Sequence, residues 1–184
     1  MNNLVEIIAV IFSLLSVVFA VKNNILTWPT AVIGVTFYSI FFYQNHIWGN
    51  MFLQILFFIQ SIYGWSKWDM IDNTKVEWLE KHDKNIIALS SFLLTIFITF
   101  ILLMTGDKSP YFDGITTSLS LIAVTLLAKK KIDTWFYWII VDVLFVAFFL
   151  IEGNYLSSVT YFVFLILAIT GLKQWKKLQI NSNL

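Results

Sequence analysis

Long apolar runs, separated by short polar connections, dominate the chain. Continuous runs of this kind do not have the alternating pattern of strands in a membrane barrel. Most of them approach the length of about 20 residues with which a helix crosses the hydrocarbon core of a bilayer. The pattern therefore predicts an all-α polytopic membrane protein with seven transmembrane helices, at about Leu4–Val21, Trp28–Tyr43, Trp48–Trp65, Ile86–Met104, Ile115–Ala128, Trp135–Ile151 and Tyr155–Leu172.

Composition agrees with a membrane protein and argues against an enzyme. Hydrophobic residues make up 59% of the 184 residues and charged residues 12%, whereas about a quarter of an ordinary globular chain is charged. The mean hydropathy is +0.79. Cysteine is absent, and His46 and His82 fall on opposite sides of the predicted membrane, so we expect neither a thiolate nucleophile nor a His-based metal site. A glycine-rich phosphate loop is also missing, and we expect no cofactor.

The lysines are distributed unequally between the two sides of the predicted membrane. With seven spans, Lys108 falls on one side and the other eleven of the twelve lysines fall on the opposite side. Cytoplasmic loops of membrane proteins carry an excess of positive charge. The distribution therefore predicts an N-terminus outside the cell and a C-terminus in the cytoplasm.

One substantial hydrophilic stretch lies at Ser66–Lys84, between the third and fourth spans. It mixes both charges, as in Glu77-Trp78-Leu79-Glu80-Lys81. A connector of this composition is expected to be a solvated cytoplasmic segment that forms, in part, an interfacial helix.

An internal repeat relates the two ends of the chain at a constant offset of 107 residues. No gap is needed over about 55 residues, and each copy contains three predicted spans. The odd span between the copies keeps them in the same orientation, so we expect a 3+1+3 architecture of parallel repeats, as in SWEET-type transporters. The single transmembrane domain, 1–184, then divides into a first three-helix bundle (4–68), a linker helix (86–104) and a second bundle (111–175). The matches include Thr27-Trp28 with Thr134-Trp135, Gly64 with Gly171, and Trp68 with Trp175.

Asp142 is a carboxylate inside an otherwise apolar span. On a helix it shares a face with Trp135 and Trp138. An ionisable side chain at this depth costs at least about 2.5 kcal/mol, and its default interpretation is a functional site. Two interpretations remain: a carboxylate satisfied by a neighbouring hydroxyl, or a contact to substrate in a central cavity. The repeat places Val35 at the matching position, so the two halves differ here, as a site for an asymmetric molecule requires.

Other polar and aromatic side chains lie at similar depths. Gln54 and Ser61 share a face of the third span, and Tyr161 is the repeat counterpart of Gln54. Each buried glutamine either joins helices or binds substrate; the interhelical role is favoured for Gln60. Two W-x-x-W pairs offer faces for a flat or cationic ring or anchors at the membrane interface, and we expect interface anchors at Trp28 and Trp175. The pairs are Trp65 with Trp68, and Trp135 with Trp138.

Three sequence features resemble the PnuC family of bacterial vitamin transporters, over nearly the whole chain. They are the run Ile62-Tyr63-Gly64-Trp65-Ser66-Lys67-Trp68, the segment Lys129–Lys131 followed by Trp135-x-x-Trp138, and Gly153-x-Tyr155. The resemblance implies an inner-membrane facilitator with a SWEET-like fold, and trimers are known in the family. It implies nicotinamide riboside as the best-known substrate, with thiamine-transporting PnuT relatives and riboflavin carriers. Transport would be facilitated diffusion followed by metabolic trapping, in which a cytoplasmic kinase phosphorylates the substrate.

Two positions depart from the pattern of nicotinamide riboside carriers. Asp142 and Ser61 stand where those carriers tend to have asparagine. A carboxylate beside aromatic faces suits the cationic ring of nicotinamide riboside or thiamine better than the uncharged ring of riboflavin. We therefore expect uptake of nicotinamide riboside, with thiamine as the alternative and a non-transporting membrane subunit as the second alternative. The expected substrate-binding residues are Asp142, Trp138, Trp135, Gln54, Ser61, Trp65, Trp68 and Tyr161.

Overall fold

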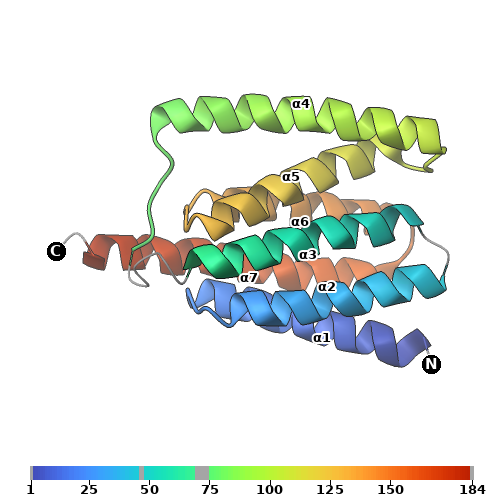
Figure 1. The fold of residues 1–184 in the computed structure, drawn as a ribbon, viewed down its shortest axis with the longest axis horizontal. Helices are drawn as coiled ribbons and strands as arrows, with labels where there is room; N and C mark the ends of the chain where they lie inside the picture. The colour runs from blue at the N-terminus through green and yellow to red at the C-terminus, as the bar shows by residue number, and fades with distance from the viewer. Residues whose placement is uncertain (1, 46–47, 69–74, 183–184) are drawn as a thin grey trace.

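The computed structural model describes residues 2–45, 48–68 and 75–182, and the described residues form seven helices (Figure 1). The all-α prediction is confirmed. Five of the helices, α1, α4, α5, α6 and α7, are long and apolar enough to cross a membrane. The helices are α1 (Asn2–Val21), α2 (Thr27–Gln44), α3 (Trp48–Trp68), α4 (Lys81–Thr105), α5 (Pro110–Ala128), α6 (Thr134–Ile151) and α7 (Tyr155–Ser182).

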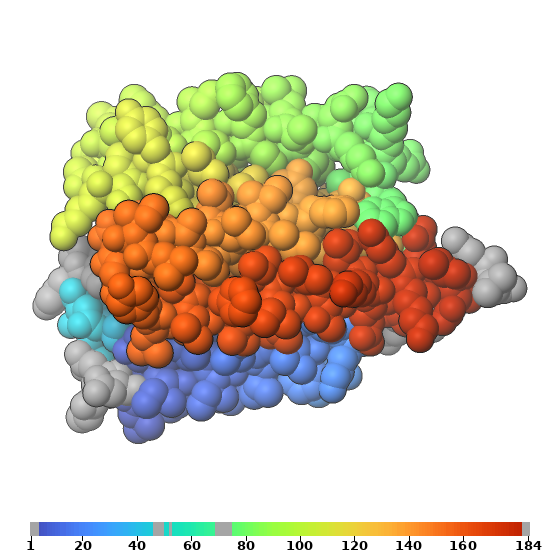
Figure 2. Space-filling model, turned by 180° about the vertical axis from the view of Figure 1, so that it is seen from behind, coloured from blue at the N-terminus to red at the C-terminus, as the bar shows by residue number. Residues whose placement is uncertain are grey.

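Six of the helices form a closed ring. Helix α1 packs on α2, α2 on α3, α3 on α5, α5 on α6, α6 on α7, and α7 returns to α1. Helix α4 lies outside this ring and packs on α5, as Figure 1 shows. From behind, α6 and α7 cross the molecule between α4 on one side and α1 and α2 on the other (Figure 2). The two termini lie at opposite ends of the bundle.

Helix α4 exposes a long apolar surface. Its side chains at Phe92, Phe97 and Met104 are 63, 61 and 75% exposed. An apolar surface of this size would cause aggregation in water, but it is suited to contact with lipid chains. On the opposite side, α4 meets α5 through small polar residues, because the Thr95 and Ser118 hydroxyls lie 2.5 Å apart.

The turns after α1 and α5 have the same unusual backbone geometry. Asn23 has φ of 50° and Lys130 has φ of 51°, and they are the non-glycine residues with positive φ in the described part of the chain. Their numbers differ by 107, the offset of the sequence repeat. Both connections lie at the end of the bundle where the lysines gather, which we call the lysine-rich end.

The connector between α3 and α4 differs from its prediction. Its described part, Lys75–Glu80, is extended rather than helical, and we call it the strap; residues 69–74 lie outside the described part. The strap runs beside the α5–α6 turn, where the Glu77 amide donates to the Lys130 carbonyl (3.2 Å) and the Ile132 amide donates to the Glu77 carbonyl (2.8 Å). The charged side chains of the strap, Lys75, Glu77 and Glu80, are exposed as expected. The apolar Val76 and Leu79 are buried, and main-chain bonds hold the strap against the second half of the chain.

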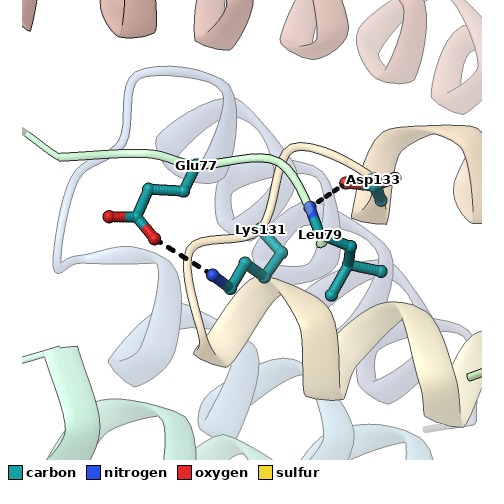
Figure 3. Close-up of polar contacts among 4 residues, drawn as sticks. All are labelled: Glu77, Leu79, Lys131 and Asp133. Atoms are coloured by element: carbon teal, nitrogen blue, oxygen red, sulfur yellow. Dashed lines mark hydrogen bonds and ion pairs between the residues drawn. The ribbon is translucent and has the colours of Figure 1, made fainter. Parts of the chain in front are cut away.

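Side chains reinforce the position of the strap (Figure 3). Lys131 Nζ lies 3.0 Å from a Glu77 carboxylate oxygen, and the Leu79 amide donates to Asp133 Oδ2 at 2.8 Å. Asp133 also lies 3.4 Å from Lys84 Nζ at the start of α4. The strap thus connects α4 to the α5–α6 turn at the lysine-rich end.

Candidate functional site

Asp142 lies near the middle of α6 and is 4% exposed. Among the described residues it makes no hydrogen bond and no ion pair. The sequence left open whether a neighbouring hydroxyl satisfies this carboxylate, and no such hydroxyl is found in the described part of the chain. A buried carboxylate without a protein partner is suited to bind a polar or cationic group that enters from outside the protein.

Tyr161 on α7 brings further polar groups toward Asp142. It lies close enough to Asp142, to Tyr38 of α2 and to Asp113 of α5 for electrostatic interaction. Four helices of the ring, α2, α5, α6 and α7, therefore contribute polar side chains that interact around Tyr161. Tyr161 was among the residues expected from the sequence. Tyr38 and Asp113 were not: Asp113 precedes the predicted span Ile115–Ala128 and falls inside the membrane helix only because α5 begins at Pro110.

Stacked aromatic rings line the side of Asp142 that points away from the lysine-rich end. The rings of Phe145 and Tyr161 stack with centroids 4.3 Å apart, and those of Phe112 and Phe148 stack at 4.1 Å. Phe145 follows Asp142 by three residues, so the two share a face of α6. The carboxylate is thus next to flat aromatic surfaces of the kind that bind planar rings.

Four tryptophans form a cluster at the lysine-rich end. The rings of Trp28 and Trp68 meet edge to face with centroids 5.4 Å apart, and those of Trp135 and Trp175 do so at 5.5 Å. All four side chains are at most 1% exposed. The prediction that Trp28 and Trp175 anchor the protein at the membrane interface is therefore wrong.

Two glycines explain how the indoles of Trp28 and Trp135 are buried. A Cβ atom added to Gly64 of α3 would overlap the ring of Trp28, and one added to Gly171 of α7 would overlap the ring of Trp135. Only glycine lets each indole lie directly against the neighbouring helix. The same six residues are partners in the 107-residue repeat, so the repeat itself held the signal for this cluster.

The structure separates the remaining expected residues. Trp138 is half-buried and packs against the tryptophan cluster, whereas Trp65 is 38% exposed on the surface of α3. Gln54 is half-buried, and the buried Ser61 donates its hydroxyl to the Phe57 carbonyl of its own helix (2.8 Å). The expected residues therefore fall into a central pair, Asp142 and Tyr161, a set at the lysine-rich end, Trp68, Trp135 and Trp138, and the separate residues Gln54, Ser61 and Trp65.

Gln60 has the interhelical role that its sequence position favoured. Its Nε2 donates to the Leu121 carbonyl at 3.0 Å and to Thr125 Oγ1 at 3.1 Å. These bonds join α3 to α5. They also border a cavity of about 310 Å³ between α3, α4 and α5, with largely apolar walls.

Comparison with known proteins decides the family. A family model described as the nicotinamide mononucleotide transporter matches residues 3–177. The chain belongs to this family. The nicotinamide riboside transporter PnuC of Escherichia coli K12 is 26% identical over 208 residues, which cover 97% of this chain and 85% of that protein. The resemblance to the PnuC family is therefore confirmed.

Other relatives of this PnuC-family chain differ in their described substrates. The riboflavin/roseoflavin transporter RibM of Streptomyces davaonensis is 21% identical, with 92% of this chain and 83% of RibM covered. The crystal structure of the vitamin B3 transporter PnuC superposes with a TM-score of 0.81, over 97% of this chain and 83% of that one, at 21% identity. The chain is thus a multi-pass membrane transporter with the PnuC fold.

Proposed function

We propose that this chain takes up a B-vitamin nucleoside or vitamin, and that its substrate is nicotinamide riboside. The observation that carries the proposal is the buried Asp142 carboxylate, which has no hydrogen bond or ion pair to any described residue. It shares a face of α6 with Phe145, whose ring stacks on Tyr161. Nicotinamide riboside presents a positively charged, planar pyridinium ring. A carboxylate balances that charge, and aromatic faces bind the ring.

The proposed roles of the individual residues follow from their positions. Asp142 faces the charged ring, and Tyr161 and Gln54, which occupy matching positions of the two repeats, hydrogen-bond to hydroxyl groups of the ribose. Trp138 joins the site from the same face of α6 as Asp142. Trp68 and Trp135 close the lysine-rich end below it. The Ser61 hydroxyl still has acceptor capacity beyond its bond to Phe57.

Transport follows from the proposed arrangement of two parallel three-helix bundles, 4–68 and 111–175, joined by the linker helix 86–104. Contacts that recur 107 residues apart support this 3+1+3, SWEET-like division. The two bundles rock around the central site, which opens to each side of the membrane in turn. The lysine distribution supports an N-terminus outside and a C-terminus in the cytoplasm of the bacterial inner membrane.

The energetics we propose are those of facilitated diffusion with metabolic trapping. The chain carries no phosphate-binding loop with which to use ATP. A cytoplasmic kinase would phosphorylate the vitamin after entry, and the product, with the added negative charge of its phosphate, would no longer fit the site. The kinase is thus a functional partner, and a homotrimer is the assembly that the family resemblance implies.

Thiamine is the alternative substrate. Its thiazolium ring is also planar and positively charged, so Asp142 and the aromatic rings suit it for the same reason. The RibM relative carries a flavin, whose ring is uncharged, and riboflavin is therefore the informative third compound in any test.

Uptake into proteoliposomes tests the proposal. Labelled nicotinamide riboside, thiamine and riboflavin are offered separately, with and without an enclosed kinase and ATP for the compound under test. We expect nicotinamide riboside to equilibrate without the kinase and to accumulate with it. If thiamine enters and nicotinamide riboside does not, the substrate is thiamine and the proposed transport mechanism still holds. If none of the three enters or binds, vitamin transport is rejected in favour of a non-transporting membrane subunit.

A further inference from the structure

Two hydrogen bonds join the halves of the chain reciprocally at the lysine-rich end. Trp68 Nε1 on α3 donates to the Leu127 carbonyl at the end of α5 (3.0 Å), and Trp175 Nε1 on α7 donates to the Ala20 carbonyl at the end of α1 (3.0 Å). The two donor residues are 107 positions apart in the sequence, and so are the two acceptor residues. The two bonds are therefore a matched pair, in which each half supplies one donor and one acceptor.

The turns after α1 and α5 leave these acceptors available. Carbonyls in the last turn of a helix lack their usual partners within the helix. The Asn23 amide donates to the Ala20 carbonyl and the Lys130 amide donates to the Leu127 carbonyl, each at 2.9 Å. A carbonyl oxygen accepts two hydrogen bonds, so each oxygen has room for the indole N–H of the other half.

Packing places this pair of bonds where it seals the bundle. Trp68 and Trp175 are each 0% exposed, and their rings lie 6.4 Å apart. Lys130 Nζ lies 4.8 Å from the centre of the Trp68 ring, and the buried Val76 of the strap belongs to the same cluster. Opening of the bundle at this cluster would require the two indoles to separate.

We propose that Trp68 and Trp175 form a latch that holds the lysine-rich end closed, and that both hydrogen bonds break in the same opening step. The inference rests on the proposed function, because only a transporter has to open this end in each cycle. Gln60 also joins the halves, but its repeat counterpart is Leu167, so it is not part of the matched pair.

Replacing either tryptophan by phenylalanine keeps an aromatic ring and removes the N–H donor. The net contribution of one such hydrogen bond corresponds to about a fivefold change in an equilibrium constant. Because both bonds break in one step, their effects multiply. We expect the open population to rise about fivefold in Trp68→Phe or Trp175→Phe and about 25-fold in the double variant.

The absence of cysteine from the chain makes the opening measurable. Ala168→Cys on α7 places one thiol at a position that is 2% exposed and belongs to the tryptophan cluster. The full-length protein in proteoliposomes is treated, without any vitamin, with a membrane-impermeant maleimide on each side separately. The labelling rate from the lysine-rich side is expected to rise about fivefold in each single tryptophan variant and about 25-fold in the double variant. Tyr63→Phe, on the exposed face of α3, is the matched control and should leave the rate unchanged.

Three results would overturn the latch. One is a labelling rate within twofold of the parent for either single variant. The second is an equal increase from both sides of the membrane together with a lower melting temperature, because that indicates general unfolding. The third is a double variant no faster than the single variants. If one variant does not fold, its symmetric partner tests the same latch. Since no vitamin is present, failure of the substrate proposal would leave this result unaffected.

Discussion

At the scale of single residues, Asp142 differs from carboxylates such as Asp133 and Glu77, which contact a lysine or a main-chain amide. Asp133 is buried and Glu77 is exposed, and each has a protein partner. Asp142 is buried, and the part of the chain that the structure describes gives it no hydrogen bond and no ion pair. A protein that used Asp142 only for stability would gain from replacing it with an apolar residue. We therefore propose that Asp142 binds substrate.

The Asp142→Asn variant tests this role. The amide has the same shape but no negative charge, so we expect the affinity for nicotinamide riboside or thiamine to fall at least about tenfold. Affinity for riboflavin, which has no ring charge to balance, should change little. Calorimetry with all three compounds gives the comparison, and Glu152→Gln at the exposed end of α6 is the control. Equal affinities in Asp142→Asn and the parent would assign Asp142 a structural role.

At the scale of elements, one buried carboxylate and one exposed ion pair add to the main-chain hydrogen bonds that hold the strap. Asp133 is 6% exposed and accepts the Leu79 amide. The Glu77 carboxylate that pairs with Lys131 is 66% exposed. Exposed pairs contribute little to stability, whereas a buried amide left without an acceptor is costly. Asp133 should therefore do more than Glu77 to fix the strap on the α5–α6 turn.

Hydrogen exchange at the strap separates the two contributions. In Asp133→Ala, the Leu79 amide loses its acceptor, and we expect it to exchange faster, with a loss of about 1–3 kcal/mol in the free energy of opening. Glu77→Gln should cost less than about 1 kcal/mol. Asp133→Asn keeps an oxygen acceptor and should fall between the two. A larger effect for Glu77→Gln than for Asp133→Ala would contradict this assignment.

At the scale of the whole molecule, the connections between helices give the two ends of the bundle different charges. The turns after α1 and α5 and the strap gather lysines at one end. The connection after α6 lies at the opposite end and carries Glu152. The positive-inside rule relates this asymmetry to the direction in which the chain is inserted.

Cysteine labelling tests the proposed orientation. Glu152→Cys and Lys173→Cys each place a single thiol at an exposed position, on opposite sides of the predicted membrane. In intact cells, an impermeant maleimide should label the cysteine at position 152 and spare the one at position 173, which should react only after permeabilisation. The reverse pattern would place the lysine-rich end outside.

The helices could be predicted from the sequence because the membrane requires long apolar segments. Their ends could not, since α4 begins at Lys81 and α7 continues to Ser182, where polar residues project into water beyond the apolar core. Asp142 was identifiable because a carboxylate stands out in an apolar run. Tyr38 comes near Tyr161 only through the packing of whole helices, which no local pattern encodes.

The burial of Trp28 and Trp175 shows where single-position reasoning failed. A tryptophan near the end of a span is equally compatible with the headgroup region and with the protein interior. For Trp28 the space left by Gly64 decides, and Gly171 leaves the matching space for Trp135. For Trp175 the bond from its indole N–H to the Ala20 carbonyl decides. Each glycine lies on a different helix from the indole that it accommodates, so the signal appears only when matching positions of both repeats are considered together.

The reciprocal tryptophan bonds also bear on how the protein is made. The bond from Trp175 to the Ala20 carbonyl joins residues separated by 155 positions. Helix α1 is therefore synthesised long before Trp175, the donor to its last turn. In the same way, Trp68 is synthesised before Leu127, whose carbonyl accepts its hydrogen bond. During synthesis the lysine-rich end remains unsealed until the seventh helix has been inserted, so closure of this end is the last step of assembly.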